Sequence, residues 1–503
     1  MSETLRGGRL GSKRDDVAEF TSSIKDDAKL AAPVIEINKA HVIMLAEQGI
    51  IKPQEATKLL KALRSKLELK MVSSSEDVHM AVEEAVLQKV GSEIGGNLHI
   101  AKSRNDQVAT VIRMQLRRDL IKLMLSAIQL QESLANTADR HVETIMLEYT
   151  HMQPAQPVTF AHYLLSRFDA LDRDLQRLQS TFKRVNLCPM GAGALATTSF
   201  PINRERVSEL LGFNGLVENS IDAVGTRDFI LEALANLTLT AINLSQLAED
   251  LIVWSSLDFG VVELPDDFTS TSSMMPQKKN PEVPEVVRAR ASHVIGDFVA
   301  AATAMKGLPS TYNLDFQEVT PKLWEAVESV DRSLKMIALL IPEVKVQSEV
   351  YEKSQSSFVA ATELANTIVR KYNIPFRSAH KIVGALVKTL IESKLTFENA
   401  TTALLAKVAM ETIGVSLMVN QADIEDSVDP KKIVKSHSIT GGPAPATVKK
   451  SLAVRKKLVS QSKSDVLSLR LKLDEAKTKL ESKAKSISEG EFSENGRLKN
   501  SKR

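Results

Sequence analysis

The sequence predicts a mainly helical, all-α protein, and three observations support this. Aromatic residues make up only 4% of the 503 residues, while Leu, Ala, Lys and Glu, which favour helix over sheet, are abundant. Two stretches, 97–153 and 226–259, contain neither Gly nor Pro, the residues that most often interrupt helices. No convincing series of alternating strand patterns is present.

In chain order, helices are expected over residues 29–70, 97–153, 226–259 and 322–341. The third of these carries apolar residues at spacings of three and four, which form one stripe: Leu231, Leu234, Leu237, Ala241, Leu244, Ala248 and Leu251. About 28 residues at 1.5 Å each would span roughly 40 Å, which is long for one globular domain. Helices of this length indicate a bundle, which we expect to be shared between subunits.

Toward the C-terminus, shorter helices are expected over 361–425, with breaks at Pro375 and Gly414. From about Lys449 the chain becomes rich in Lys, Ser and Glu. Five apolar residues in this tail keep heptad spacing: Val466, Leu469, Leu473, Ala476 and Leu480. We expect a solvated surface helix followed by a frayed end, in preference to a specific interaction module.

Composition limits the partners and the compartment of the protein. Lys+Arg total 65 and Asp+Glu total 62, and a net charge of +3 is too small to require nucleic acid or an anionic membrane. The only cysteine, Cys188, excludes an intramolecular disulfide and a Cys-based zinc site. Residues 1–16 do not resemble a secretory signal, and no run reaches the roughly 18 apolar residues of a membrane span. We therefore expect a soluble, cytoplasmic protein.

The most unusual segment is 269–285, which combines hydroxyl side chains, two lysines, an asparagine and three prolines just before a helical pattern. A rigid loop that is rich in donors and carries two cations is suited to binding a carboxylate. A plain surface loop would also be rich in Ser and Lys, so composition alone leaves both interpretations open.

Three other segments gather polar residues. His151 lies within 148–162, and histidine is suited to proton transfer near neutral pH, although a single histidine is more often structural. Segment 102–107 opens a long helix, where Ser103 or Asn105 could cap the N-terminus and where an anion could bind. The fourth segment, 311–318, could by itself be an amphipathic loop without function.

Together these segments resemble the argininosuccinate lyase family of the fumarase/aspartase superfamily. The run Ser-Ser-Met-Met-Pro-Gln-Lys-Lys-Asn-Pro at 272–281 is similar to the serine loop of the superfamily, and Gln277 and Lys279 within it point to this family. Five further blocks are similar to family blocks and occur in the same order: 7–9, 76–80, 103–107, 150–157 and 312–318.

Some positions depart from the family pattern. Thr271 replaces the glycine that usually precedes the two serines of the loop. Thr320 stands where many relatives place a lysine that meets a substrate carboxylate, and Lys322 could replace that lysine. The tail after residue 450 has no clear counterpart in the family.

The resemblance implies elimination of fumarate from argininosuccinate to give arginine, the last step of arginine biosynthesis. Ser272 would act as the base, Lys278 would stabilise the developing charge, and His151 with Glu285 would serve as acid or relay. The expected substrate contacts are Ser103, Arg104, Asn105, Thr150, Asn280, Tyr312 and Gln317. Arg227 and Asp228 could line the site, although this pair could equally be structural. No metal or other cofactor is expected.

The resemblance also implies a three-domain fold around a long central helical bundle, assembled into a homotetramer with sites shared between subunits. The expected divisions are an N-terminal helical domain (1–101), the bundle (102–353), a small helical domain (354–450) and a charged helical tail (451–503). Three alternatives stay open at this point: adenylosuccinate lyase, a structural crystallin-like protein, and binding of nucleic acid by the basic tail.

Overall fold

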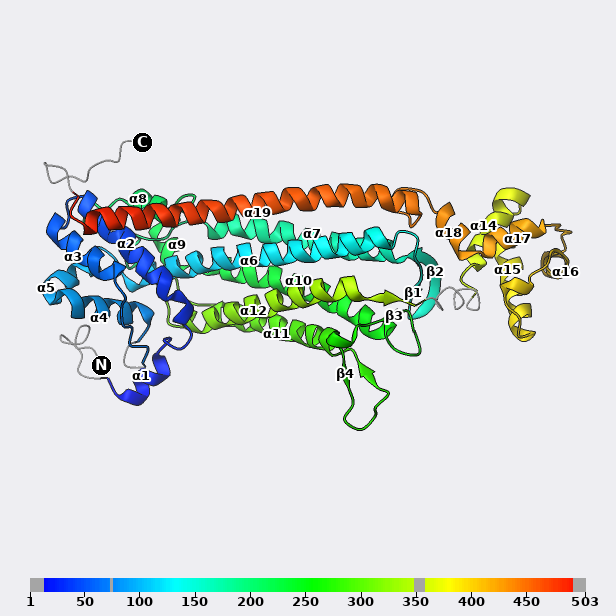
Figure 1. Ribbon diagram of the computed structural model, residues 1–503, viewed down its shortest axis with the longest axis horizontal. Helices are drawn as coiled ribbons and strands as arrows, with labels where there is room; N and C mark the ends of the chain where they lie inside the picture. The colour runs from blue at the N-terminus through cyan, green and yellow to red at the C-terminus, as the bar shows by residue number, and fades with distance from the viewer. Residues whose placement is uncertain (1–12, 73–75, 348–357, 492–503) are drawn as a thin grey trace.

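The computed structural model describes residues 13–72, 76–347 and 358–491. The molecule is an elongated bundle of long helices with a smaller helical unit at each end (Figure 1). The predicted mainly helical fold is confirmed. Within the described residues, no helix is both long and apolar enough to cross a membrane.

Five long helices form the bundle: α6 (Arg104–Arg140), α7 (Phe160–Val185), α10 (Asp228–Trp254), α11 (Glu282–Met305) and α12 (Phe316–Leu340). The predicted stripe on α10 faces the core, because its residues from Leu234 to Leu251 are buried and only Leu231 is half-buried. Removing such apolar side chains from water stabilises the bundle by about 25 cal/mol per Å². The bundle is therefore held together mainly by these apolar stripes.

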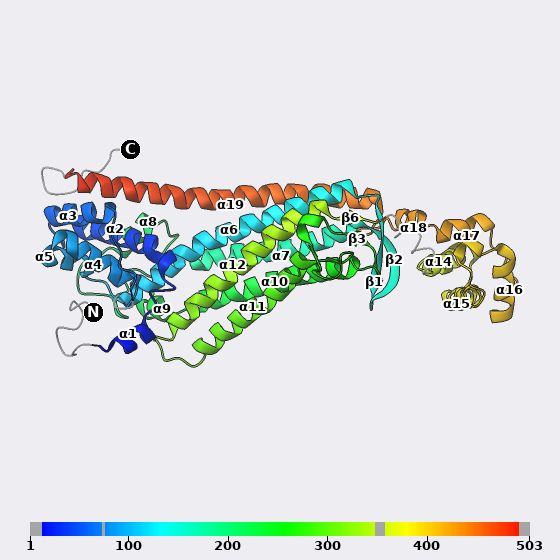
Figure 2. The same ribbon diagram turned by 60° about the horizontal axis from the view of Figure 1, so that its bottom comes forward.

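The N-terminal unit packs on the end of the bundle where α6 begins (Figures 1 and 2). The predicted helix over 29–70 is two helices, because the chain turns at Gly49, where φ is +69°, and restarts at Pro53. The helices of this unit are α1 (Asp15–Thr21), α2 (Ala31–Glu47), α3 (Pro53–Arg64), α4 (Val78–Val90) and α5 (Ser92–Gly95). Two short helices, α8 (Arg204–Leu210) and α9 (Ser220–Gly225), lie near the same end.

The unit at the opposite end has a hydrophobic core of its own. It contains α14 (Ala361–Tyr372), α15 (Phe376–Glu392), α16 (Thr402–Ile413), α17 (Gln421–Val428) and α18 (Pro430–Ser436). The predicted breaks are confirmed: Pro375 precedes α15, and Gly414, with φ +69°, ends α16.

The tail differs from the expected solvated helix. Helix α19 (Pro445–Ser488) returns along the whole bundle and contacts α6, α7, α8, α2 and α3 (Figure 1). One face is buried through Val448, Leu452, Val459, Val466, Leu480, Ala484 and Ile487. The heptad spacing thus marks a face that packs against the protein's own bundle. The residues expected to fray after position 491 lie outside the described residues.

The expected helix over 97–153 is wrong at its C-terminal end. Helix α6 stops at Arg140, and β1 (Ile145–Thr150) pairs with β2 (Gln153–Thr159) in an antiparallel hairpin. Residues such as Ile145, Tyr149 and Thr150 favour strands, and Pro154 would disrupt a helix that continued. The other strands form two short pairs, β3 (Val262–Glu263) with β6 (Lys345–Val346) and β4 (Ser270–Thr271) with β5 (Lys279–Asn280).

Candidate functional site

A pocket of about 410 Å³ lies where α6 and α12 begin, against the N-terminal unit. It brings together five residues that the sequence singled out as substrate contacts: Ser103, Arg104, Asn105, Tyr312 and Gln317. Ser103 caps α6, and Arg104 and Asn105 lie in its first turn. Gln317 lies at the start of α12 and Tyr312 just before it, about 200 positions later in the sequence.

The start of α6 is fixed by the cap that the sequence predicted. The Ser103 Oγ accepts a hydrogen bond from the Asn105 backbone N–H over 3.4 Å, and Asp106 accepts one from the Ser103 N–H over 3.0 Å. Asp106 also accepts the N–H groups of Gly191 and Gly193 at 3.1 and 2.9 Å. These contacts hold the first turn of α6 in one orientation at the edge of the pocket.

Carboxylates on the opposite wall were not assigned roles from the sequence: Asp26, Asp27, Glu76 and Asp77. Burial raises the pKa of Asp27 to about 6, although hydrogen bonds from Ser23 and the Val78 N–H oppose this. Burial also raises the pKa of Asp77, whose Oδ1 lies 3.2 Å from Nη1 of Arg104. This wall is therefore rich in acceptors. The block at 76–80, which is similar to a family block, was the sequence signal that could have pointed to this wall.

Two buried side chains at or beside this pocket have nitrogen atoms without a hydrogen-bond partner among the described residues. Both ring nitrogens of His79, which lines the pocket, have no hydrogen-bond partner among the described residues. The guanidinium of Arg227 is buried 4.5 Å above the Phe316 ring and donates to the carbonyl oxygens of Val224 and Thr226, but its Nε and Nη2 are unpaired. Unpaired buried donors are uncommon and favour a role next to the pocket for Arg227.

The segment predicted to carry the base is a hairpin loop between β4 and β5, which projects from the side of the bundle (Figure 1). The Ser272 Oγ accepts the backbone N–H groups of Met274 and Met275 at 3.2 and 3.1 Å. Lys279 is engaged by Asp266 at 2.7 Å and Glu263 at 3.5 Å. By contrast, Lys278 is exposed and forms no ion pair with any described residue. The loop therefore offers one oriented hydroxyl and one unpaired cation.

The other two predicted residues of this region follow the loop directly. Asn280 lies in β5 opposite Ser270, and Glu285 is exposed in the first turn of α11. Ser272, Lys278, Asn280 and Glu285 therefore belong to one continuous segment, the β4–β5 hairpin and the first turn of α11.

The histidine segment is the turn of the β1–β2 hairpin, at the far end of α6 from the first pocket (Figure 1). His151 and Met152 have φ of 54° and 60°, so the turn holds two consecutive non-glycine residues in the left-handed region. Both Thr150 and His151 are exposed. Burial and the Asp250 carboxylate raise the pKa of the neighbouring Glu148 to about 7.

Within one chain, the pocket meets neither the histidine hairpin nor the serine loop. Helix α6 has 37 residues and so separates Ser103 from the histidine hairpin by about 55 Å. Helix α11 has 24 residues and so separates the serine loop from the segment containing Tyr312 by about 35 Å. Figure 1 shows both hairpins far from the start of α6, and Figure 2 shows the same for the β1–β2 hairpin.

Lys322 does not line the pocket that Thr320 lines. Its Nζ lies 2.8 Å from Glu325 and 3.9 Å from Asp297, and these two carboxylates occupy its charge. The structure therefore gives no support to Lys322 as the replacement for a lysine at position 320. In the described part of the chain, no group of three or more His, Cys, Asp or Glu side chains is arranged to hold a metal ion.

Comparison with known proteins identifies relatives along the chain. A lyase family model matches residues 8–296, and an argininosuccinate lyase C-terminal model matches residues 358–435. The chain is 42% identical to the argininosuccinate lyase of Methanocaldococcus jannaschii over 469 residues, covering 92% of this chain and 96% of that protein. It is 44% identical to that of Methanothermobacter thermautotrophicus over 466 residues, covering 91% and 99%.

Solved structures share the fold. An EDDS lyase in complex with formate superposes with a TM-score of 0.85 at 29% identity, covering 95% of this chain and 97% of that one. A class II fumarase from Schistosoma mansoni superposes with a TM-score of 0.68 at 17% identity, covering 81% and 91%, which supports the fold alone.

Proposed function

This chain belongs to the argininosuccinate lyase family and is a lyase, and from that premise we propose that it splits argininosuccinate into fumarate and arginine. The base would remove a proton from the carbon beside a carboxylate of the succinyl half. Negative charge would collect on that carboxylate, the carbon–nitrogen bond would break, and the guanidino nitrogen would take a proton. In the cell this reaction would complete arginine biosynthesis in the cytoplasm.

The observation that carries this proposal is the geometry of the serine loop. A serine hydroxyl is a weak base unless its alkoxide is stabilised. The backbone N–H groups of Met274 and Met275 already point at the Ser272 Oγ, and they would stabilise negative charge there. Lys278 in the same loop has no ion-pair partner among the described residues and would bind the carboxylate that gains charge. Asn280 would add a donor to that group.

The pocket at the start of α6 would hold the arginine half of the substrate. That half carries a guanidino group and an α-ammonium group, and Asp27, Asp77 and their acidic neighbours suit both. Arg104, Asn105, Tyr312 and Gln317 would contact the polar atoms of the remaining substrate. His151 with Glu285 would supply the proton to the leaving nitrogen, and Thr150 would contact substrate beside His151.

Such a site requires more than one chain, since α6 and α11 hold the pocket tens of Å from the histidine hairpin and from the serine loop. We infer a homotetramer in which each site takes segments from different subunits. The bundle offers a surface for this assembly, because α10, α11 and α12 carry exposed apolar side chains: Leu239, Ile242, Val286, Ile295, Val299, Met336 and Leu339.

We also propose the division into an N-terminal domain (1–101), a central bundle (102–353) and a small domain (354–450). The tail from residue 451 onward would then belong with the bundle, since α19 packs along it. This division makes the small domain an insertion between two helices of the bundle.

One assay tests the activity. Purified protein is mixed with argininosuccinate, and fumarate release is followed by its ultraviolet absorbance, with adenylosuccinate assayed beside it. Fumarate should form from argininosuccinate and not from adenylosuccinate. Turnover of adenylosuccinate only would assign the other enzyme, and absence of turnover with both would favour a structural, crystallin-like protein.

A further inference from the structure

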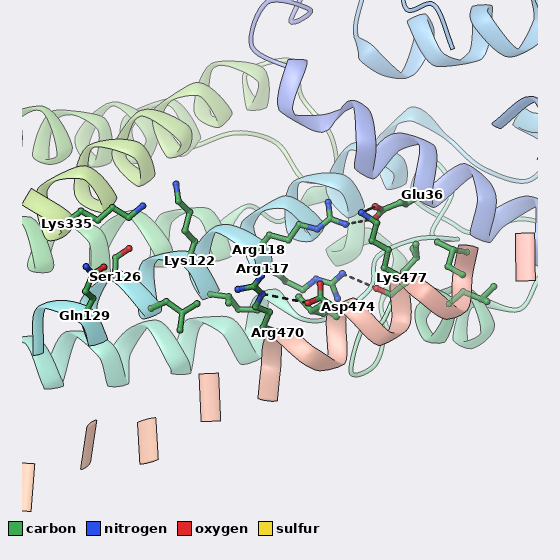
Figure 3. A pocket seen from close by; sticks show the side chains of 16 residues that line it. Glu36, Arg117, Arg118, Lys122, Ser126, Gln129, Lys335, Arg470, Asp474 and Lys477 are labelled. Atoms are coloured by element: carbon green, nitrogen blue, oxygen red, sulfur yellow. Dashed lines mark hydrogen bonds and ion pairs between the residues drawn. The ribbon is translucent and has the colours of Figure 1, made fainter. Parts of the chain in front are cut away.

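A second cavity of about 630 Å³ lies in the side of the bundle and contains none of the residues assigned to the lyase site. Its walls come from α2, α6, α12 and α19, with the end of α8 closing one side (Figure 3). Its volume is within the range of about 300–1,000 Å³ that is usual for small-molecule sites.

Positive charge dominates this cavity. Six cationic side chains line it: Arg117, Arg118, Lys122, Lys335, Arg470 and Lys477. Three carboxylates face them. Glu36 lies 3.6 Å from Lys477 and also pairs with Arg118, and Asp474 lies 3.7 Å from Arg470. Asp331, just behind the wall, pairs with both Lys122 at 2.9 Å and Lys335 at 2.8 Å. Two of the three carboxylates are thus each shared by two cations.

Unlike the other five cations, Arg117 has no carboxylate partner among the described residues. Its guanidinium is buried and donates hydrogen bonds to three neutral oxygens over 2.7 to 3.0 Å. These are the Asn186 Oδ1 and the backbone carbonyl oxygens of Gly212 and Leu211. Because no carboxylate cancels it, its charge adds to the field of the cavity. The cavity therefore has an excess of three positive charges over the carboxylates that pair with them.

The rest of the lining is apolar. It consists of Ile121, Leu125, Leu210, Leu211, Leu473 and Leu480. A cavity for inorganic anions alone would gain nothing from such a surface, since apolar side chains offer no donor to an anion. A molecule with a multiply charged head and an apolar body would use both parts.

We propose that this cavity binds an organic phosphate that carries at least two negative charges and an apolar or aromatic body. Lys122 and Lys335 from one side and Arg470 and Lys477 from the other would bind the phosphate oxygens. The body would lie on the leucines. An occupant would tie α19 to α6, the helix whose first turn carries Ser103 and Asn105.

The test uses the intact protein with ATP as the probe, and isothermal titration calorimetry as the readout. ATP should bind saturably. Lys122→Ala combined with Arg470→Ala should weaken binding at least about tenfold, since the phosphate loses two charge-assisted contacts. Both side chains are more than half exposed, and Lys335 still pairs with Asp331 in the variant, so the fold should survive; an unchanged melting temperature verifies this.

Lys456→Ala combined with Lys463→Ala is the matched control. These lysines also lie on α19, each forms a 2.8 Å ion pair with the bundle, and neither lines the cavity. The control should bind ATP like the unmodified protein. Equal weakening of ATP binding in both variants would mean that binding depends only on the net charge of the protein. Binding that neither variant changes would mean that ATP binds outside this cavity. Either result would overturn the proposal. No binding, or tripolyphosphate binding as tightly as ATP, would also overturn the proposal.

Discussion

Met275 donates its backbone N–H to the Ser272 Oγ over 3.1 Å, three residues along the same loop. Met274 donates a second N–H to this oxygen over 3.2 Å, so the hydroxyl is held by its own loop before any substrate arrives. Two N–H dipoles that converge on one oxygen stabilise the alkoxide more than the neutral hydroxyl.

Replacing Ser272 with alanine should therefore abolish turnover while substrate still binds. The hydroxyl would act in the transition state, so kcat should fall by at least about a thousandfold and the substrate Kd should change little. Steady-state kinetics with equilibrium binding of argininosuccinate measures the two effects separately. Ser273→Ala is the matched control and should keep most of its activity. A Ser272→Ala protein with a tenth of the normal kcat would rule out Ser272 as the base.

Shortening or weakening α19 should destabilise the fold. A chain that ends after Ser451 would lose five large buried side chains: Leu452, Val459, Val466, Leu480 and Ile487. At about 1.5–3 kcal/mol each, their burial is comparable to the whole stability of a typical domain, about 5–15 kcal/mol. We expect this truncated chain not to accumulate as folded protein, and circular dichroism with light scattering checks this.

Two leucines on α19 provide a sharper comparison. Leu480 is 1% exposed and Leu471 is 58% exposed. Leu480→Ala should cost about 2–5 kcal/mol of unfolding free energy, and Leu471→Ala less than about 0.5 kcal/mol. Equal, small losses in urea unfolding would mean that α19 does not pack on the bundle.

The pH dependence of stability should change on replacing Glu148. Burial and Asp250 raise the pKa of this carboxyl from 4.5 to about 7, so the folded chain binds its proton more tightly than the unfolded chain. The free energy of unfolding therefore falls as pH rises from about 4.5 to about 7. Glu148→Gln removes the ionisable carboxyl, so the variant should not lose this free energy of unfolding as pH rises.

The variant should match the unmodified protein near pH 4.5 and exceed it at pH 8. After allowance for partial exposure, we expect a gain of about 1–2 kcal/mol at the higher pH. Thermal melting at both pH values measures this, with the exposed Glu143→Gln as control. A Glu148→Gln protein that is less stable at pH 8 would show that the charged carboxylate is stabilised in the fold.

The sequence predicted the bundle well because a long helix can be recognised from the pattern of its own residues. An apolar stripe and the absence of Gly and Pro marked α10 from its own residues, and the candidate caps Ser103 and Asn105 marked the start of α6. The same rule failed for the β1–β2 hairpin, whose turn uses His151 and Met152 in place of glycine. A turn built from such residues carries no sequence signal of the usual kind.

Contacts between distant segments were harder to predict. The heptad residues of α19 indicated an apolar face, but nothing local states that Val466 packs on the protein's own bundle. Likewise, the acidic wall of the pocket joins Asp27 to the segment around Asp77, fifty residues later, through the hydrogen bond from the Val78 N–H to Asp27. Such neighbours follow from the tertiary fold and not from local propensity.

Mixing two inactive variants should restore activity if the sites are shared between chains. Ser272→Ala removes the base, and His151→Asn removes the proposed acid from the turn of the β1–β2 hairpin. The serine loop and the segment with Tyr312 lie about 35 Å apart, and the histidine hairpin lies about 55 Å from Ser103, so no chain completes a site alone. If each site takes these segments from different chains, some sites in a mixed oligomer receive both intact.

Random reassembly of equal amounts should make roughly a quarter of the sites whole, by the combinatorics of a symmetric oligomer. The two proteins are dissociated together, reassembled and assayed for fumarate release, and native mass measurement confirms that hybrids formed. Each variant reassembled alone should stay inactive. An inactive mixture that contains verified hybrids would mean that Ser272 and His151 serve one site within one chain.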